Sequence, residues 1–565
     1  MKKNKHLILL ILISFVALLL RLWKLGEVPP SMHWDEPSWG YNAYSILKTG
    51  RDEYGNFMPL VFKAFGDWKS AAYVYLTVPS VAIFGLNEFA VRFPAALFGA
   101  ISVFLIFFVF QEIFKEFEKK EVVGIIASVV LAFSPWSYHY SHGAWEVNIL
   151  LTFLLLGIYF FLKANEKPWF FYVSALFFGL CFYVYNSAKL LIPLIILGLA
   201  LIFWNELKKI ASRQLLISSL ILLFMIMPVF KFTFFGGAGG RLKIMSVFSY
   251  PRSEKETAQL VKEEGGTAKS LSYQIFHGGP HYFLRGVLGR YLNHFSPRFL
   301  FFEGDWSNPR HSVPFAGVLN FLDILFLPLG VYFLISRKVK NKQSLLLRNQ
   351  NFFWYLLLIT PLPSALSRDI IQATRSYFMI IPLAVISAFG IYFVWEKLQR
   401  FRNLLKFGIT TVLVLGYLFS FVYYFDQFFV HAPIQNSQEW QYGYKEAVRY
   451  VLENGKNYQK IVFTQKYGQP YIYYLFYSQY DPRIYQAQAK LIENPEGDVG
   501  RVEKLDNIDF LEIYWPKDRF IKDTLFIGKP DELPEKDIIT GESRLLKKIY
   551  FLNGEPAFHI VETVK

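Results

Sequence analysis

Residues 91–111 read VRFPAALFGAISVFLIFFVFQ. Apart from Arg92 near its start, this stretch carries no charged residue. A helix needs about 20 mostly apolar residues to cross the hydrocarbon core of a bilayer. The stretch therefore predicts a transmembrane helix.

Ten further stretches have a similar length and character, so the sequence predicts about eleven transmembrane helices. The first begins after a lysine-rich N-terminus and is not followed by a small-residue cleavage site. We therefore interpret it as an uncleaved membrane anchor. The predicted spans are 6–24, 91–111, 123–140, 145–164, 170–186, 188–205, 214–235, 316–335, 352–367, 376–395 and 404–425.

The overall composition agrees with a membrane protein. Of 565 residues, 53% are hydrophobic and only 18% are charged, whereas ordinary globular chains carry about 25% charged residues. The single cysteine, Cys181, excludes a disulfide within the chain. The net charge of +15 is typical of a membrane protein with basic cytoplasmic loops, so we expect no nucleic-acid partner.

Basic residues in the short connections predict the orientation. With the N-terminus in the cytoplasm, lysine and arginine collect in the cytoplasmic connections, for example 112–122, 206–213 and 396–403. The short turns on the other side hold few basic residues. The sequence thus predicts a multi-pass protein of the cell membrane.

Three long segments then lie outside the cytoplasm. Residues 25–90 and 236–315 are outer loops of a transmembrane domain that covers residues 1–425. Residues 426–565 form an extracytoplasmic soluble domain. The predicted fold class is a multi-pass α-helical membrane protein with this C-terminal α/β domain.

The α/β prediction rests on local patterns within residues 426–565. Tyr444–Leu452 has a helical pattern, and Lys460–Thr464 resembles a strand. Leu545–Leu552 and Ala557–Val561 are separated by an Asn-Gly pair, which predicts a β-hairpin.

The first outer loop holds the most informative polar residues. Asp35 and Glu36 follow the first predicted span by about ten residues and lie beside Trp34. One carboxylate of such a pair can accept a proton in general base catalysis. The alternative is a solvated turn in which Asp35 caps a helix and Pro37 lies near its first position.

Further polar residues lie at the predicted outer ends of the spans. Cations at this depth suit a phosphate group at the level of the lipid headgroups. The alternatives are contacts with anionic lipids or structural ion pairs. The candidates are Lys69, Arg92, His142, Glu146, Lys189, Arg241 and Arg375.

The order of motifs along the chain resembles the GT-C superfamily of polyprenyl-phosphate-sugar glycosyltransferases. The first outer loop contributes Trp34-Asp35-Glu36 and Lys69, and the second span begins with VRFPAALFGA at 91–100. The sequence SPWSYHYSHGAWE follows at 134–146, and NHFSPRFLFFEGDWSNPRHS lies at 293–312. The protein O-mannosyltransferase and bacterial aminoarabinose-transferase branches are the most similar.

This resemblance implies inverting transfer of a sugar from a polyprenyl-phosphate donor to an acceptor hydroxyl at the outer face. The acceptor is a protein, a lipid or a glycan of the cell envelope. Asp35 is the implied base, supported by Glu36, and Lys69 matches a lysine near the lipid phosphate. The resemblance implies no divalent metal and no other cofactor.

The same resemblance implies further cations around the donor. Lys189, Arg241 and Arg375 rank below Lys69 as phosphate ligands. An arginine is expected where His142 and Lys189 stand in this chain. Lysine keeps the charge without the bidentate geometry of arginine, and a neutral histidine supplies no charge.

Two other functions remain open on the sequence alone. The first alternative is a multi-pass transporter or flippase of a lipid-linked or small solute. Such a protein should carry ionisable or helix-breaking residues near the bilayer midplane. The second is a noncatalytic sensor, which leaves Asp35 and the cations without a role.

Overall fold

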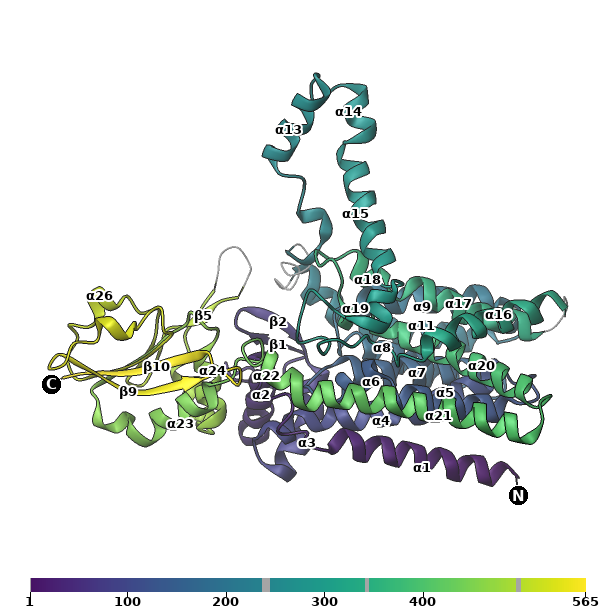
Figure 1. Ribbon diagram of the computed structural model, residues 1–565, viewed down its shortest axis with the longest axis horizontal. Coiled ribbons are helices and arrows are strands. Elements are labelled where there is room, and N and C mark those ends of the chain that lie inside the picture. The colour runs from purple at the N-terminus through teal and green to yellow at the C-terminus, as the bar shows by residue number, and fades with distance from the viewer. Residues whose placement is uncertain (1, 236–243, 341–344, 494–498, 565) are drawn as a thin grey trace.

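The computed structural model describes residues 2–235, 244–340, 345–493 and 499–564 of the chain. A bundle of long helices makes up most of the molecule, and a sheet with its helices lies at one end of the bundle (Figure 1). A helical arm projects sideways from the bundle near that end (Figure 1). The predicted phosphate ligand Arg241 lies outside the described residues.

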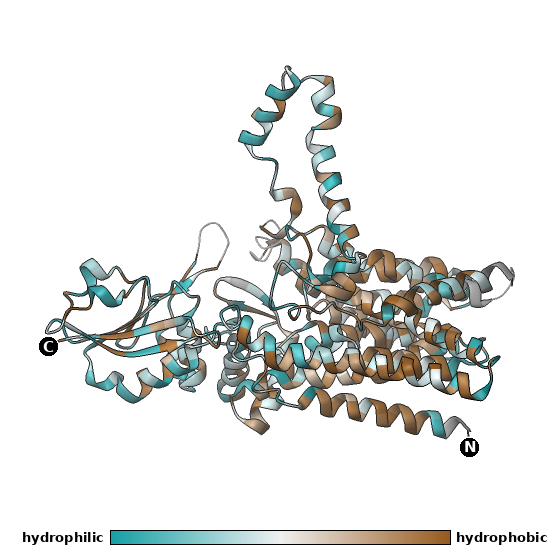
Figure 2. Ribbon diagram, in the orientation of Figure 1, coloured by the Kyte–Doolittle hydropathy of each residue, from teal (hydrophilic) through white to brown (hydrophobic). Residues whose placement is uncertain are grey.

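The bundle contains the apolar helices. Figure 2 shows them as the most hydrophobic part of the molecule. Its members are α1 (Lys2–Leu22), α4 (Glu88–Ile113), α5 (Lys120–Phe133), α7 (Val147–Lys163), α8 (Phe170–Cys181), α9 (Ala188–Ile202), α11 (Ser212–Phe235), α16 (Asp323–Lys340), α17 (Leu345–Ile359), α20 (Ile380–Leu398) and α21 (Asn403–Asp426). Short helices join them: α6 (Pro135–His139), α10 (Trp204–Leu207), α18 (Leu362–Ala365), α19 (Ala373–Ser376) and α22 (Ala432–Gln435).

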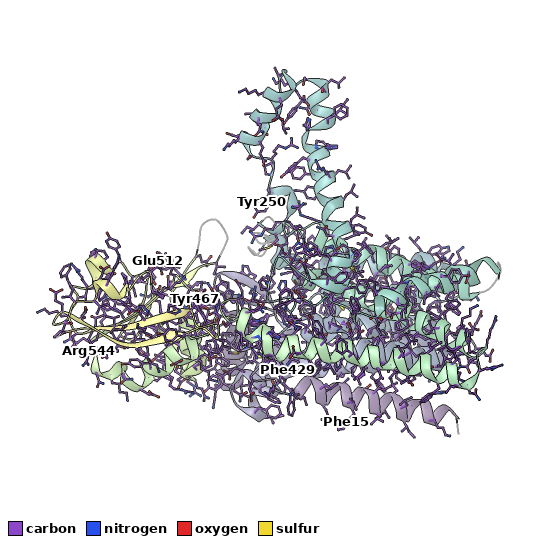
Figure 3. All side chains as sticks on the ribbon, viewed as in Figure 1. Phe15, Tyr250, Phe429, Tyr467, Glu512 and Arg544 are labelled. Carbon is purple, nitrogen blue, oxygen red and sulfur yellow. The ribbon has the colours of Figure 1, made fainter. Side chains whose placement is uncertain are left out.

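Five helical segments of the described residues are long and apolar enough to cross a membrane. They are Lys5–Leu22, Glu88–Ile113, Ser212–Phe235, Ala373–Leu398 and Asn403–Gln435. Outward-facing apolar side chains such as Phe15 on α1 leave the bundle surface hydrophobic (Figure 3). Length and surface together support a multi-pass membrane protein, as the sequence predicts.

Each predicted span overlaps a helix, but several boundaries were wrong. Span 123–140 is two helices, because Ser134 is extended and Pro135 starts the short helix α6. In the predicted span 316–335 the helix begins only at Asp323. In the predicted span 352–367 the long helix ends at Ile359. The number of eleven membrane crossings stays a prediction.

The first predicted outer loop folds against the end of the bundle. It contains α2 (Asp35–Thr49), a hairpin of β1 (Val61–Ala64) and β2 (Asp67–Ser70), and α3 (Ala72–Phe84). The hairpin strands are antiparallel. The arm seen in Figure 1 contains α13 (Glu254–Glu264), α14 (Leu271–Phe276) and α15 (Gly279–Asn293).

The C-terminal part is built around a six-stranded sheet with the order β6-β7-β3-β8-β10-β9. Strand β3 is parallel to both neighbours, while β10 is antiparallel to β8 and β9. All residues of β8 are buried, as expected for a strand covered on both faces. The strands of this sheet are β3 (Lys460–Phe463), β6 (Lys504–Leu505), β7 (Ile508–Phe510), β8 (Thr524–Gly528), β9 (Ser543–Tyr550) and β10 (Pro556–Thr563). Strands β4 (Leu491–Ile492) and β5 (Arg501–Val502) form a separate antiparallel pair.

Helices flank this sheet, namely α23 (Tyr444–Asn454), α24 (Pro470–Tyr477), α25 (Pro482–Gln488) and α26 (Trp515–Asp518). The predicted helix at Tyr444–Leu452 and the strand at Lys460–Thr464 agree with α23 and β3. The predicted hairpin agrees with β9 and β10. Local patterns sufficed for these elements because each alternates or repeats clearly along the sequence.

The C-terminal part also fixes the segment that precedes α2. The hydroxyl of Tyr473 donates to the carbonyl of Met32 at 2.7 Å. The main-chain nitrogen of Trp34 donates to the amide oxygen of Gln441 at 3.0 Å. These bonds hold the start of α2 in place, although the paired residues are far apart in the sequence.

Candidate active site

Asp35 is the first residue of α2, and its carboxylate faces the β1–β2 hairpin. Lys69 on β2 places its ammonium 3.0 Å from Oδ1 of Asp35. The alternative in which Asp35 caps the helix was wrong, because Trp34 occupies the cap position and no side-chain cap bond forms. The structure thus joins two residues that the sequence analysis selected separately.

His33 completes the immediate surroundings of this carboxylate. Its Nδ1 lies 3.7 Å from Oδ2 of Asp35. Burial lowers the pKa of the His33 imidazole to about 4, and the positive charge of Arg310 contributes to the decrease. His33 is therefore neutral at pH 7, and Lys69 is the cation in contact with Asp35. The Asp35 side chain remains 26% exposed, so a substrate can reach it.

Glu36 points away from Asp35 and forms a buried ion pair with Arg92 of α4. Nε of Arg92 donates to Oε1 at 3.1 Å, and Nη2 donates to Oε2 at 3.0 Å. The main-chain nitrogen of Ala144 donates to Oε1 at 2.7 Å. The two side chains are only 4% and 0% exposed, which indicates a structural pair behind Asp35.

Arg92 also organises the segment that leads into α2. Its guanidinium donates to the carbonyl oxygens of Leu25, Pro29 and Ser31 at 3.2, 3.0 and 2.6 Å. Every nitrogen of the guanidinium therefore has a partner within this chain. A phosphate cannot bind Arg92 without breaking that network.

Glu146 lies in the turn before α7, which begins at Val147. Burial raises the pKa of its carboxyl from 4.5 to about 8. The negative charge of Asp35 adds to the increase, and the positive charge of Lys69 opposes it. Glu146 is thus close to the Asp35–Lys69 pair and mostly protonated at pH 7.

The raised pKa of Glu146 predicts a pH-dependent stability. Its stabilising contribution is complete below pH 4.5 and is lost as the pH rises through about 8. We expect a change from pH 5 to pH 9 to lower the melting temperature of the wild type more than that of Glu146→Gln. Thermal unfolding of both proteins in detergent at the two pH values measures this difference. Equal decreases would contradict the raised pKa.

His142 is buried among aromatic rings in the turn between α6 and α7. Its ring centroid lies 4.7 Å from that of Tyr138 and 5.0 Å from that of Phe428. Nδ1 contacts the carbonyl of Val28 at 3.2 Å. Burial lowers the pKa of His142 to about 3, so the ring supplies no positive charge at this position.

Lys189 and Arg375, the remaining predicted cations in the described part of the chain, already have partners. Nζ of Lys189 donates to Oγ1 of Thr233 at 3.0 Å. Nη1 of Arg375 lies 2.8 Å from Oδ2 of Asp369. Arg375 is 17% exposed, so its guanidinium remains accessible from one side.

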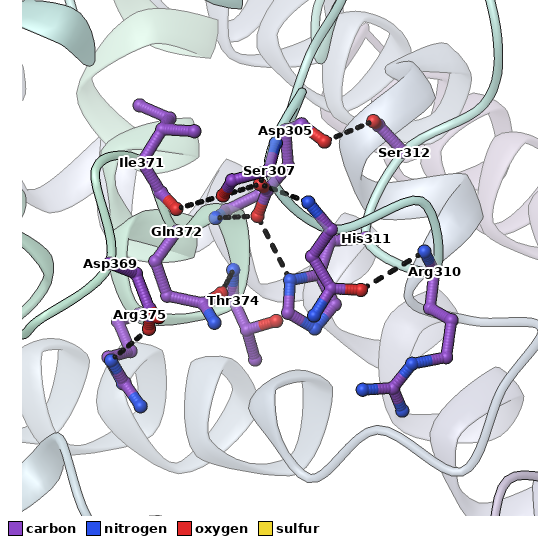
Figure 4. A network of polar contacts seen from close by, with 12 residues as sticks. Asp305, Ser307, Arg310, His311, Ser312, Asp369, Ile371, Gln372, Thr374 and Arg375 are labelled. Carbon is purple, nitrogen blue, oxygen red and sulfur yellow. Dashed lines mark hydrogen bonds and ion pairs between the residues drawn. The ribbon is translucent and has the colours of Figure 1, made fainter. Parts of the chain in front are cut away.

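The segment after α15 contains a polar network that the motifs did not predict (Figure 4). Oδ2 of Asp305 accepts a hydrogen bond from Nδ1 of His311 at 2.9 Å and another from the main chain of Ala373 at 2.9 Å. The main-chain nitrogen of Ser307 donates to Oδ1 of Asp305, and its hydroxyl donates to the carbonyl of Ile371. The network holds this segment against the start of α19, which carries Arg375.

Arg310 belongs to the same segment, but its guanidinium points away from the network (Figure 4). Its carbonyl oxygen accepts a hydrogen bond from Nε2 of His139 at 2.7 Å. Asp35 and Glu439 are among the charges that act on the guanidinium. Within the described residues, no hydrogen bond or ion pair to this guanidinium is present. Arg310 is therefore a cation near Asp35 that is available to a ligand.

Trp145 is a second residue that the analysis did not select. Its ring lies edge-on to His311, with centroids 5.3 Å apart, and 6.2 Å from Trp440. The indole nitrogen is buried, and it has no hydrogen-bond partner in the described part of the chain. Gly143 makes room for it, because a Cβ there would lie 2.4 Å from that nitrogen.

Both missed residues lay inside quoted motifs, at 134–146 and 293–312. A polar atom without a partner could have been found only from the folded structure. Within the described residues, no group of three or more histidine, cysteine or carboxylate side chains could hold a metal ion.

Residues 69–232 match the sequence model of a family described as dolichyl-phosphate-mannose-protein mannosyltransferase. No curated protein matches the chain in sequence.

Two solved structures share the fold. ArnT from Cupriavidus metallidurans, bound to undecaprenyl phosphate, matches with a TM-score of 0.52 and 10% identity, over 98% of this chain and 97% of that chain. AglB, the oligosaccharyltransferase from Archaeoglobus fulgidus in complex with an inhibitory peptide and a dolichol-phosphate, matches with a TM-score of 0.52 and 13% identity. That match covers 84% of this chain and 64% of AglB, so this chain spans less than two thirds of the AglB length. The resemblance to GT-C glycosyltransferases, inferred from the motifs, is confirmed.

Proposed function

We propose that this chain is an inverting glycosyltransferase that moves a sugar from a polyprenyl-phosphate donor to an acceptor hydroxyl. The observation that carries the proposal is the partly exposed Asp35 carboxylate, which is paired with Lys69 at 3.0 Å. It is also close to the guanidinium of Arg310, which has no hydrogen-bond or ion-pair partner among the described residues. A base beside fixed cations suits a reaction whose leaving group is a lipid phosphate. The similarity to ArnT and AglB, solved with polyprenyl-type phosphates, supports the same donor class.

In the proposed reaction, Asp35 accepts the proton of the acceptor hydroxyl. The acceptor oxygen attacks the anomeric carbon as the bond from that carbon to the phosphate oxygen breaks. The polyprenyl phosphate leaves with the bonding electron pair, and Lys69, Arg310 and Arg375 stabilise its charge. A single displacement inverts the configuration of the anomeric carbon.

Glu36 and Arg92 then act as positioning residues. Their buried pair fixes the start of α2, from which Asp35 projects. We propose that Glu146 and Trp145 line the same site and contact the sugar or the acceptor. The indole nitrogen of Trp145 can donate to a sugar hydroxyl, because it has no partner among the described residues.

In this proposal, the acceptor approaches from the extracytoplasmic side. Residues 426–565 form a C-terminal domain on the same side. A cavity of about 570 Å³ between α23 and the segment before α2 offers space on that side. Ser31, Glu88, Tyr442 and Arg449 are among its lining residues. Tyrosine rings and charged groups of both signs suit a protein, lipid or glycan acceptor, so the class is left to experiment.

The proposal is tested with the full chain reconstituted in liposomes. A panel of labelled polyprenyl-phosphate sugars is supplied with membrane acceptors, and label is followed into protein, lipid and glycan fractions. Transfer from one donor identifies the sugar and the acceptor class. Solute or lipid flux without transfer would instead support the transporter or flippase alternative.

Variants of Lys69 test whether transfer depends on the positive charge at this position or on the shape of the side chain. We expect Lys69→Met to reduce kcat about 100- to 1000-fold, because a cation is removed from the developing phosphate charge. Lys69→Arg should retain more activity, since it keeps the charge at the same place. Equal kcat values for Lys69→Met and the wild type would remove Lys69 from the mechanism. Lys63→Met, on the neighbouring strand, is the matched control.

A further inference from the structure

The projecting arm has a distinct position relative to the bundle (Figure 1). It leaves the bundle at the end that carries the C-terminal sheet and extends roughly perpendicular to the bundle helices. A segment perpendicular to spanning helices runs parallel to the plane of the membrane. Within the arm, α13 lies on the side of the C-terminal sheet, and α15 lies on the side of the bundle.

The base of the arm is attached to the bundle by hydrogen bonds of α15. The hydroxyl of Tyr291 donates to the carbonyl of Leu358 at 2.8 Å, and Nδ2 of Asn293 donates to that of Ile370 at 3.3 Å. Nη2 of Arg290 donates to the carbonyl of Arg368 at 3.3 Å. These contacts fix the direction in which α15 projects.

One face of α15 is apolar and uncovered. Leu284, Leu288 and Leu292 follow at intervals of four residues, which places them on one face of a helix. They are 50–62% exposed. Leu271, Ile275 and Phe276 of α14 add further exposed apolar side chains.

The opposite face of α15 packs on the other leg of the arm. The ring of Tyr282 lies 4.9 Å from the guanidinium carbon of Arg252, and Phe283 lies 5.4 Å from Phe248. The leucine face therefore points away from α13, toward the bundle side of the arm. The α13 helix is hydrophilic (Figure 2).

The two parts of the arm also differ in charge. Residues 265–293 contain three basic residues, Lys269, Arg285 and Arg290, and no acidic residue. The α13 helix carries four glutamates, namely Glu254, Glu256, Glu263 and Glu264, against two lysines, Lys255 and Lys262, so it is acidic overall. A basic amphipathic segment fits an anionic lipid surface, whereas an acidic one fits water.

We propose that α14 and α15 lie on the bilayer surface, with the leucine face in the headgroup region and Lys269 and Arg285 at anionic lipid phosphates. The α13 helix then faces the water. The inference depends on the membrane location of the bundle and is independent of the proposed reaction.

The depth of the arm is tested on the full chain in lipid nanodiscs by spin labelling. Leu288→Cys reports on the apolar face, and Lys262→Cys on α13 is the matched control. The native Cys181 is buried, so it is protected from labelling. We expect the Leu288 label to collide with oxygen and to be shielded from a water-soluble nickel chelate, and the Lys262 label to show the reverse. If the label at position 288 is as accessible to the nickel chelate as the label at position 262, the proposal is overturned. Shielding from both quenchers also overturns it, because it indicates a protein partner or a second copy of the chain.

The lipid charge is tested by the composition of the nanodisc. We expect deeper immersion of the Leu288 label with phosphatidylglycerol than with phosphatidylcholine. Arg285→Gln should reduce that difference, since each basic residue at an anionic surface contributes about a fivefold preference. Equal immersion in both lipids would overturn the part of the proposal that concerns anionic headgroups. Sugar transfer is not measured, so this test can fail or succeed whatever the reaction proves to be.

Discussion

Asp35→Asn is expected to reduce sugar transfer about 100- to 10,000-fold, the range typical of a removed general base. Asparagine keeps the size and one oxygen of the side chain but cannot accept the proton of the acceptor hydroxyl. The carboxylate is 26% exposed, and the amide oxygen of asparagine can still accept a hydrogen bond from Lys69. We therefore expect the variant to fold normally and to lose kcat while it still binds the donor.

The measurement compares kcat and donor affinity for the wild type, Asp35→Asn and Asp426→Asn. Asp426 is a matched control, because its carboxylate is 52% exposed and pairs with His431 at 3.3 Å. Activity of Asp35→Asn within a few-fold of the wild type, at equal protein abundance, would contradict the assignment of the base.

Arg92→Met is expected to produce the largest loss of stability. It leaves the Glu36 carboxylate buried without its bidentate partner, and it also removes donors from three main-chain carbonyls. Breaking a buried pair from one side typically costs about 3–5 kcal/mol. Thermal unfolding and membrane abundance of the full chain measure the effect.

The double variant Arg92→Met/Glu36→Met separates the charge from the packing. Replacing both partners removes the uncompensated carboxylate, so we expect the double variant to be more stable than Arg92→Met alone. It should remain below the wild type, since the carbonyls of Leu25, Pro29 and Ser31 stay without their donor. A wild-type melting temperature for Arg92→Met would refute the structural role of the pair.

The helices of the bundle could be predicted because each depends on its own sequence. An apolar run of about 20 residues needs no distant partner to define it. Boundaries were less accurate where a single residue changes the backbone direction, as Ser134 does before Pro135. The helix predicted from residue 316 begins only at Asp323, because residues 316–322 are irregular.

The site was only partly predictable because it is made by distant contacts. Asp35 and Lys69 were chosen from motifs, but the register of the β1–β2 hairpin decides that they meet. Glu36 was expected to support or orient Asp35, but its ion pair with Arg92 of α4 could not be read from the sequence.

The role of Arg310 was even less predictable from the sequence, because it also depends on contacts between distant residues. It lies in an irregular segment that Asp305 holds against Ala373, and no periodicity in the sequence reveals that contact. A guanidinium without a partner is visible only when all its neighbours are placed.

In the proposed mechanism, a lipid phosphate binds beside Asp35. An experimental structure of the full chain with bound undecaprenyl phosphate tests this position. We expect the phosphate oxygens to lie about 3 Å from nitrogens of Lys69 or Arg310, next to the Asp35 carboxylate. A phosphate bound away from these cations would refute the proposed site.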